Sequence, residues 1–337
     1  MKKILVTGGA GYIGSHTTLL LLQHGFEVVV LDNLCNSSAE SIKRIGQIAG
    51  RLPLFIKGDI RDSGTLNQIF NDHKIDAVLH FAGLKSVGES VINPILYYEN
   101  NVMGTIALCL AMKKASVKTI VFSSSATVYG DPDAVPIREE HSVIHITNPY
   151  GRSKLMVEQI LSDLCVADKD WCVALLRYFN PVGAHESGHI GEDPNGVPNN
   201  LLPFIAQVAV GRLPELLVFG GDYPTQDGTG VRDYIHVVDL AEGHLSALRA
   251  LQSSAGSHLW NLGTGKGYTV LQMVQAFEDA SGCRVPYRIV SRRAGDIAEC
   301  FADASKAERE LNWRAQRDLS EIMRDAWRWQ SMNPNGY

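Results

Sequence analysis

Near its beginning the chain reads Lys3-Ile4-Leu5-Val6-Thr7-Gly8-Gly9-Ala10-Gly11-Tyr12-Ile13-Gly14, and its fold class follows from this stretch. A short apolar run predicts a strand, the glycines predict a tight turn, and a helical pattern continues to residue 22. Gly9, Gly11 and Gly14 fit G-x-G-x-x-G, whereas Gly8, Gly11 and Gly14 fit the wider G-x-x-G-x-x-G. Such glycines let a diphosphate approach the N-terminus of the helix, although glycines alone also occur in ordinary turns.

The next apolar run strengthens the nucleotide-binding interpretation. Residues 28–31 predict a second strand, which ends at Asp32. A carboxylate at this point of the fold can bind the hydroxyls of an adenine ribose. It would repel a 2′-phosphate, and Asn33 follows it in place of an arginine. The order strand, glycines, helix, strand and aspartate therefore favours NAD over NADP.

Strands and helices continue to alternate along the first half of the chain. Apolar runs at residues 54–56, 77–81, 119–122 and 172–176 predict further strands, with helical stretches such as 94–115 between some of them. This alternation predicts an α/β fold with a Rossmann-type doubly wound parallel sheet. Composition changes near residue 180, where a stretch rich in Gly, Pro, Asn and His begins. We expect an NAD-binding domain over 1–180 and a smaller α/β C-terminal substrate domain over 181–337, with segments near 232–250 packing back on the first.

Composition bounds the class of protein. The chain has 337 residues, 45% hydrophobic and 20% charged, and a net charge of -5. These values fit a globular protein with substantial cores, and predict neither nucleic acid nor membrane as a partner. The apolar run at residues 4–6 ends too early for a signal peptide, and no stretch is long enough to span a bilayer. Six cysteines without Cys-x-x-Cys spacing predict free thiols and a cytoplasmic location.

A second informative stretch is Asn148-Pro149-Tyr150-Gly151-Arg152-Ser153-Lys154. Asn148 can cap a helix and proline suits its first position. Tyr150 and Lys154 then share one face, one turn apart. A lysine ammonium there would favour the phenolate and make Tyr150 a usable general base or acid. Taken alone, the pattern fits a surface tyrosine and a solvated lysine better, so its weight comes from the surrounding motifs. Ser125 ends the strand at 119–122 and can act with Tyr150.

Several other polar residues admit two interpretations. Asp59 follows the third strand and can either meet an adenine amino group or cap the next helix, with equal weight. His80 lies inside a strand and is expected to be a core residue. Lys85 follows a strand end, where ligands bind in such folds. His185 and His189 lack a clear third ligand, so no metal site is predicted.

Two arginine-containing stretches lie late in the sequence, at residues 232–237 and 292–296. Arginine binds diphosphate in a forked geometry. Each stretch taken alone could be a solvated face, but together they suit an acidic nucleotide.

The complete run of motifs resembles the extended short-chain dehydrogenase/reductase family, in the branch that epimerises UDP-hexoses at C4. The matching stretches are residues 6–14, 31–34, 80–85, 123–130, 148–154, 177–184, 198–200, 230–237 and 292–296, and similarity reaches residue 313. The resemblance implies an NAD that is held tightly and regenerated. It implies that Tyr150 takes the proton of the sugar 4-hydroxyl, that Lys154 lowers the pKa of Tyr150 and holds the nicotinamide ribose, and that Ser125 assists proton movement.

The resemblance also implies two sets of binding residues. Those that line NAD are Gly8, Gly11, Tyr12, Ile13, Gly14, Asp32, Asn33, Asn36, Asp59, Ile60, Phe81, Ala82, Lys85, Asn100, Ser125, Tyr150, Lys154 and Phe179. Those that line the UDP-sugar are Asn180, Asn200, Leu201, Phe219, Arg232, Tyr234, Arg293, Asp296 and Cys300. A homodimer is implied as well, in which the helices around residues 94–115 and 150–165 pair as a four-helix bundle.

Cys300 stands where members restricted to UDP-glucose and UDP-galactose carry a tyrosine beside C2 of the sugar. A cysteine leaves room for an N-acetyl group, and the resemblance therefore implies UDP-GlcNAc and UDP-GalNAc as further substrates. The alternative for Cys300 is a plain buried thiol in a strand.

Two other functions fit the same fold. An NDP-sugar 4,6-dehydratase needs an added acid and base, and its relatives carry Asp-Glu where this chain has Ala126-Thr127. A non-catalytic NAD-binding regulator would not need Tyr150, Lys154 and Ser125 together. The motifs favour the epimerase over both.

Overall fold

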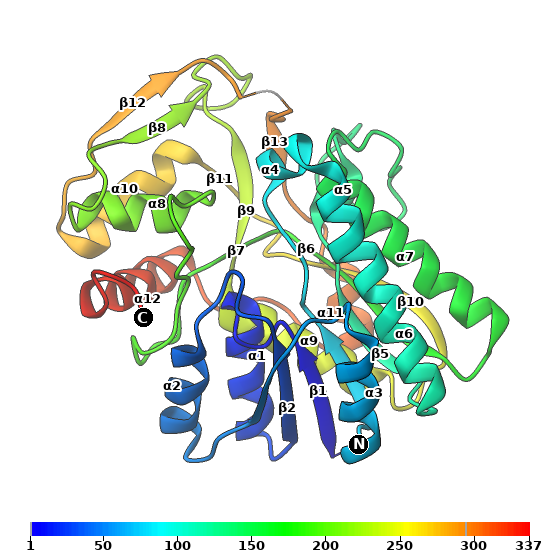
Figure 1. Cartoon of the computed structure of the whole chain (residues 1–337). Helices are drawn as coiled ribbons and strands as arrows, with labels where there is room; N and C mark the ends of the chain where they lie inside the picture. The colour runs from blue at the N-terminus through cyan, green and yellow to red at the C-terminus, as the bar shows by residue number, and fades with distance from the viewer. Residues whose placement is uncertain (1, 294) are drawn as a thin grey trace.

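The computed structural model describes residues 2–293 and 295–337 (Figure 1). Ala294, inside the arginine motif at 292–296, lies outside the described residues. The largest sheet has seven strands, all parallel to their neighbours. Their spatial order is β10 (Gly256–Leu262), β6 (Cys172–Tyr178), β5 (Thr119–Ser123), β4 (Ala77–His80), β1 (Lys3–Thr7), β2 (Glu27–Asp32) and β3 (Leu54–Lys57). The predicted doubly wound parallel sheet is confirmed.

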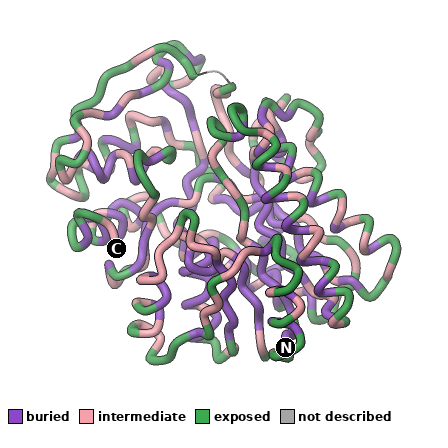
Figure 2. The backbone as a smooth tube through the Cα atoms, viewed as in Figure 1, coloured by how far each residue is buried: buried purple, intermediate pink, exposed green. Residues whose placement is uncertain are grey.

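The central strands are buried on both faces, which explains why they are continuous apolar runs. In β1, Ile4 and Val6 face one core and Leu5 faces the other, because successive side chains point to opposite sides of a sheet. The first core is covered by α1 (Tyr12–Gln23), α2 (Ala39–Ala49), α9 (Val237–Ala250) and α11 (Ser305–Leu311). The second is covered by α3 (Ser63–Asp72), α6 (Gly104–Lys114) and α7 (Pro149–Ala167). Figure 2 shows the strands between these layers as buried.

The helical stretch expected over 94–115 is present, but it is not one regular α-helix. It consists of α5 (Pro94–Tyr97), a π-helical segment η1 (Tyr98–Met103) and α6, and it follows a short α4 (Val87–Ile92). The π-helical segment contains Asn100 and Asn101, both buried. Asn101 Nδ2 donates to the Leu84 carbonyl and to Ser153 Oγ, both at 3.0 Å. This side chain therefore ties the helical segment to the loop after β4 and to α7.

A second region lies across the carboxyl ends of the large sheet (Figure 1). Its core packs α8 (Leu201–Ala209), α10 (Val270–Ser281) and α12 (Leu319–Met332) against short strands. In one small sheet, β9 (Val231–His236) pairs with β7 (Asn180–Val182), β11 (Gly267–Thr269) and β13 (Glu299–Cys300). In another, β8 (Leu216–Phe219) pairs with β12 (Tyr287–Val290). A short 3-10 helix η2 (Ala126–Tyr129) follows β5.

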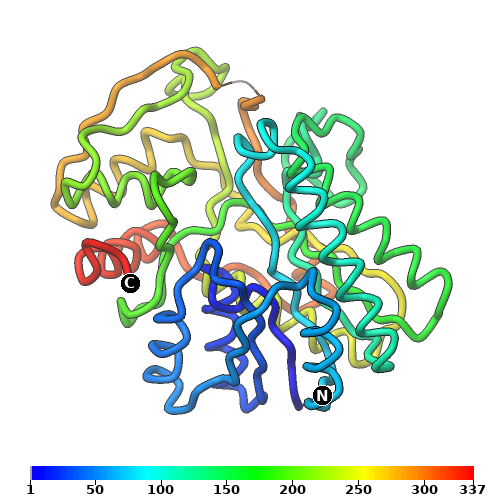
Figure 3. The backbone as a smooth tube through the Cα atoms, in the orientation of Figure 1, coloured from blue at the N-terminus to red at the C-terminus, as the bar shows by residue number. Residues whose placement is uncertain are grey.

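The chain crosses between the two regions more than once. After β9 it returns to the large sheet, where α9 packs beside α1 and β10 adds an edge strand next to β6. Figure 3 shows this segment, in yellow, among the blue and cyan elements of the first half. The division into domains 1–180 and 181–337, with segments near 232–250 packing back on the first, stays a prediction.

Candidate active site

A large cavity lies between the large sheet and the second region. Its volume is about 1040 Å³, and its lining comes from strand ends, from the N-termini of α1, α7 and α8, and from β8, β9 and the loop before β13. Carboxyl ends of parallel strands are where ligands bind in such folds. All predicted site residues except Asp59 line this cavity, so the structure brings the cofactor set and the substrate set together.

The glycine turn is built for close approach of backbone to backbone. Gly8 has a φ of 71°, and a Cβ there would lie 2.6 Å from the Ala82 nitrogen. A Cβ on Gly14 would lie 2.2 Å from the Gly8 carbonyl oxygen. Gly11 is the N-cap of α1 and offers no side chain to its free N–H groups. The first N–H groups of α1 lie at the cavity wall, where they suit a diphosphate. The residues present therefore fit a dinucleotide.

Asp32 also organises the backbone around the glycine turn. Its carboxylate accepts hydrogen bonds from Ala10 N at 3.0 Å, Leu34 N at 2.9 Å and Ser37 Oγ at 2.8 Å. It is buried yet lines the cavity. Its position suits a ribose, and binding of the ribose stays a prediction.

Asp59 lies next to the cavity lining without belonging to it. Its carboxylate accepts from Asn33 Nδ2 at 3.0 Å and from Arg61 Nε and an Arg61 terminal nitrogen, both at 2.9 Å. Arg61 holds the pKa of Asp59 well below its ordinary value. The helix that follows is capped by Asp62, whose side chain accepts from Gly64 N. The capping interpretation of Asp59 is therefore wrong, and the adenine interpretation stays a prediction.

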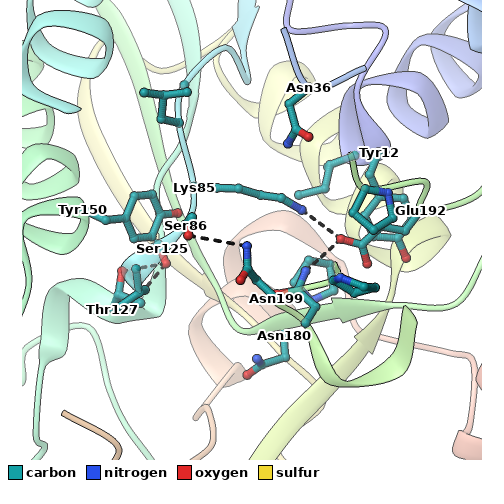
Figure 4. Close-up of a pocket in the computed structure, with 18 of the residues that line it drawn as sticks. Tyr12, Asn36, Lys85, Ser86, Ser125, Thr127, Tyr150, Asn180, Glu192 and Asn199 are labelled. Atoms are coloured by element: carbon teal, nitrogen blue, oxygen red, sulfur yellow. Dashed lines mark hydrogen bonds and ion pairs between the residues drawn. The ribbon is translucent and has the colours of Figure 1, made fainter. Parts of the chain in front are cut away.

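The N-terminus of α7 forms as predicted. Asn148 is its N-cap, its Oδ1 accepts from Gly151 N at 2.8 Å, and proline occupies the first turn. Tyr150 is 7% exposed and Lys154 5% exposed, and both line the cavity. The interpretation as a surface tyrosine and a solvated lysine is therefore wrong. Figure 4 shows the Tyr150 ring beside Ser125.

The electrostatics of Tyr150 depend on its burial and on Ser125. Burial raises the pKa of Tyr150 above its ordinary value, and a hydrogen bond with the Ser125 side chain lowers it. Lys154 Nζ donates to the Ser123 carbonyl at 2.8 Å and lies 5.9 Å from the centre of the Tyr150 ring. Burial has the larger effect of the two, and the lowering of the Tyr150 pKa expected from Lys154 stays a prediction. Burial also lowers the pKa of Lys154 to about 8.

A buried ion pair lies behind these residues. Arg177 in β6 donates to both carboxylate oxygens of Glu158 in α7, from Nε at 2.9 Å and from a terminal nitrogen at 2.6 Å. Ser124, at the end of β5, donates to the same carboxylate. Three elements that reach the cavity are thus joined at one point. This network explains Ser124, one of the three consecutive serines, without a role in the cavity.

The substrate side gathers cations and an aromatic ring. Arg232 is paired in register with Cys300 across β9 and β13. The Arg293 guanidinium lies 5.7 Å from the centre of the Phe219 ring and donates to Asp296 at 2.9 Å. The Arg293 side chain is 58% exposed, so it can turn toward a ligand. Burial raises the pKa of Cys300 to about 11, which keeps its thiol neutral.

The structure also locates the histidines that the sequence analysis interpreted. His80 is buried between Thr7 and Thr105, at 2.7 and 2.9 Å, and burial lowers its pKa to about 3. It is a core residue, as expected. His185 bonds Ser187 Oγ at 2.9 Å. Over residues 2–293 and 295–337, no three His, Cys, Asp or Glu side chains cluster as metal ligands would. In the same residues, no helix combines the length and apolar character needed to span a bilayer.

Some cavity residues escaped the sequence analysis. They include Tyr178, whose hydroxyl bonds Ser123, as well as Tyr223 and Glu192. Tyr178 follows Arg177 in a strand, and its position at a strand end could have indicated it. Glu192 lies in the aperiodic stretch after residue 183, where no pattern indicates which side chain points inward.

Comparisons with known proteins show the family to which this chain belongs. A family model described as GDP-mannose 4,6 dehydratase matches residues 5–326. UDP-glucose 4-epimerase of Bacillus subtilis (strain 168) is 63% identical over 334 residues, covering 99% of this chain and 98% of the relative. The crystal structure of UDP-glucose 4-epimerase from Bifidobacterium longum in complex with NAD+ and UDP superposes with a TM-score of 0.97 at 54% identity, covering 100% of both chains.

A UDP-Glc/GlcNAc 4-epimerase from Campylobacter jejuni superposes with a TM-score of 0.85 at 37% identity, covering 98% of this chain and 100% of that one. The full-length identity to curated relatives, together with the matching folds, identifies this chain as a member of the UDP-glucose 4-epimerase family of extended short-chain dehydrogenases/reductases.

Proposed function

We propose that this protein interconverts UDP-glucose and UDP-galactose by inverting C4 of the sugar, with NAD as a resident cofactor. The observation that carries the proposal is the burial of Tyr150, Lys154 and Ser125 in the same cavity as the glycine turn. A general base beside a dinucleotide site suits removal of a hydroxyl proton together with hydride transfer.

In this proposal each residue of the group moves or holds a proton. Tyr150 takes the proton of the sugar 4-hydroxyl and later returns it. Ser125 donates a hydrogen bond that stabilises the phenolate and links Tyr150 to the sugar oxygen. Lys154 supplies a positive charge near the phenolate and hydrogen bonds for the nicotinamide ribose. When bound, NAD would supply the hydride acceptor and donor that inversion at C4 requires.

The substrate side supports inversion because it can hold the nucleotide and leave the sugar free to turn. Arg232 and Arg293 provide two forked cations for one diphosphate, and Phe219 provides an aromatic face beside Arg293. Asn180, Asn200, Leu201, Tyr234, Asp296 and Cys300 complete this wall. Strong contacts on the UDP end leave a 4-keto sugar able to rotate between two orientations.

The decisive experiment uses the purified protein without added NAD. We expect UDP-galactose to be converted to UDP-glucose, and denatured protein to release about one NAD or NADH per chain. Activity that consumes added NAD in proportion to product would contradict the proposal. A 4-keto-6-deoxy product would instead support the dehydratase. Ala126 and Thr127 argue against that reaction, since neither can supply the acid and base that it needs.

We propose UDP-GlcNAc and UDP-GalNAc as a second pair of substrates. Cys300 lines the cavity and packs beside the small apolar cluster of Ala126 and Phe179, next to Arg232. A thiol is much smaller than a phenol, so this wall leaves volume for an N-acetyl group. Incubation with UDP-GalNAc should yield UDP-GlcNAc, and an enzyme that is inert toward it while converting UDP-galactose would contradict this part.

We also propose a cytoplasmic homodimer. The six cysteines are all free, as expected of a reducing compartment. The helical segments α5, η1, α6 and α7 carry apolar side chains that face outward, among them Ile95, Met103, Leu110 and Met156. Large exposed apolar surfaces of this kind are typical of interfaces.

A further inference from the structure

Glu192 joins two walls of the cavity through one carboxylate oxygen. Its Oε1 accepts a hydrogen bond from Lys85 Nζ at 2.8 Å (Figure 4). The same oxygen accepts a hydrogen bond from Asn200 Nδ2 at 2.8 Å. Lys85 follows β4 and belongs to the cofactor side. Asn200 is the N-cap of α8 and belongs to the substrate side. All three residues line the cavity. One acceptor atom therefore connects a side chain from each set.

Glu192 is itself held firmly. Trp329 Nε1 in α12 donates to its carbonyl at 3.2 Å, and the Tyr337 hydroxyl lies 3.3 Å from both the nitrogen and the oxygen of Gly191. The Glu192 side chain is 8% exposed, whereas that of Lys85 is 47% exposed. A flexible lysine gains a defined position from a partner fixed in this way, at a cost in side-chain entropy.

The charge of Glu192 needs an explanation, because the cavity is proposed to take two diphosphates. A bare carboxylate in that wall would repel both of them. Paired with Lys85, it contributes no net negative charge and serves to aim the ammonium group. Its remaining hydrogen bond, from the neutral Asn200 amide, orients a group on the nucleotide-sugar side.

On the basis of the proposed function, we propose that Glu192 is a positioning residue that couples NAD retention to UDP-sugar binding. It does so by fixing Lys85 on one side of the cavity and Asn200 on the other. Loss of the carboxylate charge should then affect both ligands at once. It should raise KM more than it lowers kcat, since Glu192 is separate from the proton-transfer group of Tyr150, Lys154 and Ser125.

The test compares Glu192→Gln with Glu186→Gln, which makes the same chemical change at an exposed position of the same segment. For Glu192→Gln we expect about tenfold weaker binding of UDP by calorimetry and about tenfold faster loss of NAD on dilution, the scale of a broken coupled contact. Glu186→Gln should resemble wild type. Equal behaviour of the two variants, or a loss of thermal stability in Glu192→Gln with unchanged UDP affinity, would overturn the inference.

Lys85→Met is the second variant, and it keeps the test informative if Glu192→Gln fails to fold. Although Lys85 lies on the cofactor side, its loss should weaken UDP binding in protein that still holds NAD. The double variant Glu192→Gln with Lys85→Met should bind UDP no more weakly than the single variant with the lower UDP affinity, because the pair acts as a unit. Unchanged UDP affinity in Lys85→Met, or additive effects, would refute the coupling. A wild-type protein that binds neither NAD nor UDP would instead contradict the proposed function.

Discussion

At the scale of single residues, the proposed chemistry depends on Tyr150, a phenol whose buried environment works against ionisation. Burial raises the pKa of Tyr150, and a hydrogen bond with the Ser125 side chain offsets part of this effect. The positive charge on the nicotinamide ring of NAD+ and the Lys154 ammonium would both favour the phenolate. We therefore expect Tyr150 to become a competent base when NAD+ is bound.

Tyr150→Phe should lose most turnover while it keeps its fold and its NAD. Removal of a general base costs a factor of about 10² to 10⁴, and the ring itself continues to pack. The measurement is kcat for UDP-galactose, with the NAD content determined on the same sample. Near-normal turnover in this variant would move the catalytic role to another group.

Lys154 should give the activity an alkaline limit. Burial lowers its pKa to about 8, so the ammonium is present below that pH and is lost as the pH rises through it. Without the ammonium, the phenolate and the nicotinamide ribose lose a partner. We therefore expect kcat/KM to fall above about pH 8, and the fall to move to higher pH in Lys154→Arg, because arginine stays charged. An alkaline limit at the same pH in both proteins would assign it to a different group.

Cys300→Tyr tests the volume argument for N-acetylated substrates. A tyrosine would fill the space beside Arg232 and Phe179, so conversion of UDP-GalNAc should be abolished and conversion of UDP-galactose largely kept. The readout is kcat/KM for both substrates, with Cys300→Ser as the control of similar size. Parallel loss of both activities would indicate general damage to the site.

At the scale of elements, the position of α7 depends on the buried pair of Glu158 and Arg177. The pair ties α7 to β6, and Ser124 ties it to β5, the strand that leads to Ser125. The relative positions of Tyr150 and Ser125 follow from this junction. Its members were visible in the sequence only as isolated charges, since helical and strand periodicity do not show which charges meet inside a core.

Arg177→Met should therefore destabilise the protein by about 3–5 kcal/mol, because it leaves the Glu158 carboxylate buried without its partner. The double variant Glu158→Met with Arg177→Met should recover most of that loss, since it removes both charges. Urea unfolding measures the effect. Lys118→Met is the matched control, because Lys118 pairs with Asp168 and Asp170 near the surface. A loss in Arg177→Met no larger than in Lys118→Met would contradict this account.

Local sequence patterns predicted these elements well, and there is a physical reason for what such patterns cannot predict. The glycine turn, the cap of α7 and the parallel strands follow from short-range geometry, and the structure has them where the sequence places them. The burial of a side chain does not follow from short-range geometry in the same way. Helical spacing places Tyr150 and Lys154 on one face, but the depth of that face, which determines both pKa values, depends on packing from distant segments. Glu192 was missed for the same reason, because its partners lie on elements far apart in sequence.

At the scale of the whole molecule, the chain crosses more than once between the large sheet and the second region, which lie on opposite sides of the cavity. The core under α1 and α9 and the core of the second region both contribute side chains to the cavity lining, and the C-terminal helix α12 supports Glu192 from behind. This arrangement leaves one outer surface unexplained, formed by α5, η1, α6 and α7. Ile95, Met103 and Leu110 are 74%, 58% and 64% exposed. All three side chains lie on this surface, in α5, η1 and α6 respectively.

The proposed homodimer would bury this face against its copy, with two helices from each chain. A two-fold interface brings the same side chains together from both partners, so one substitution acts twice. Leu110→Glu should therefore convert the dimer to a monomer in sedimentation, because it sets two carboxylates inside an apolar contact. Leu52→Glu, a change at a side chain that is 67% exposed outside these helices, should leave the dimer intact. A wild-type protein that sediments as a monomer would refute the dimer. A Leu110→Glu protein that stays dimeric would place the interface elsewhere, and retention of NAD by the monomer would show that each chain contains a complete cofactor site.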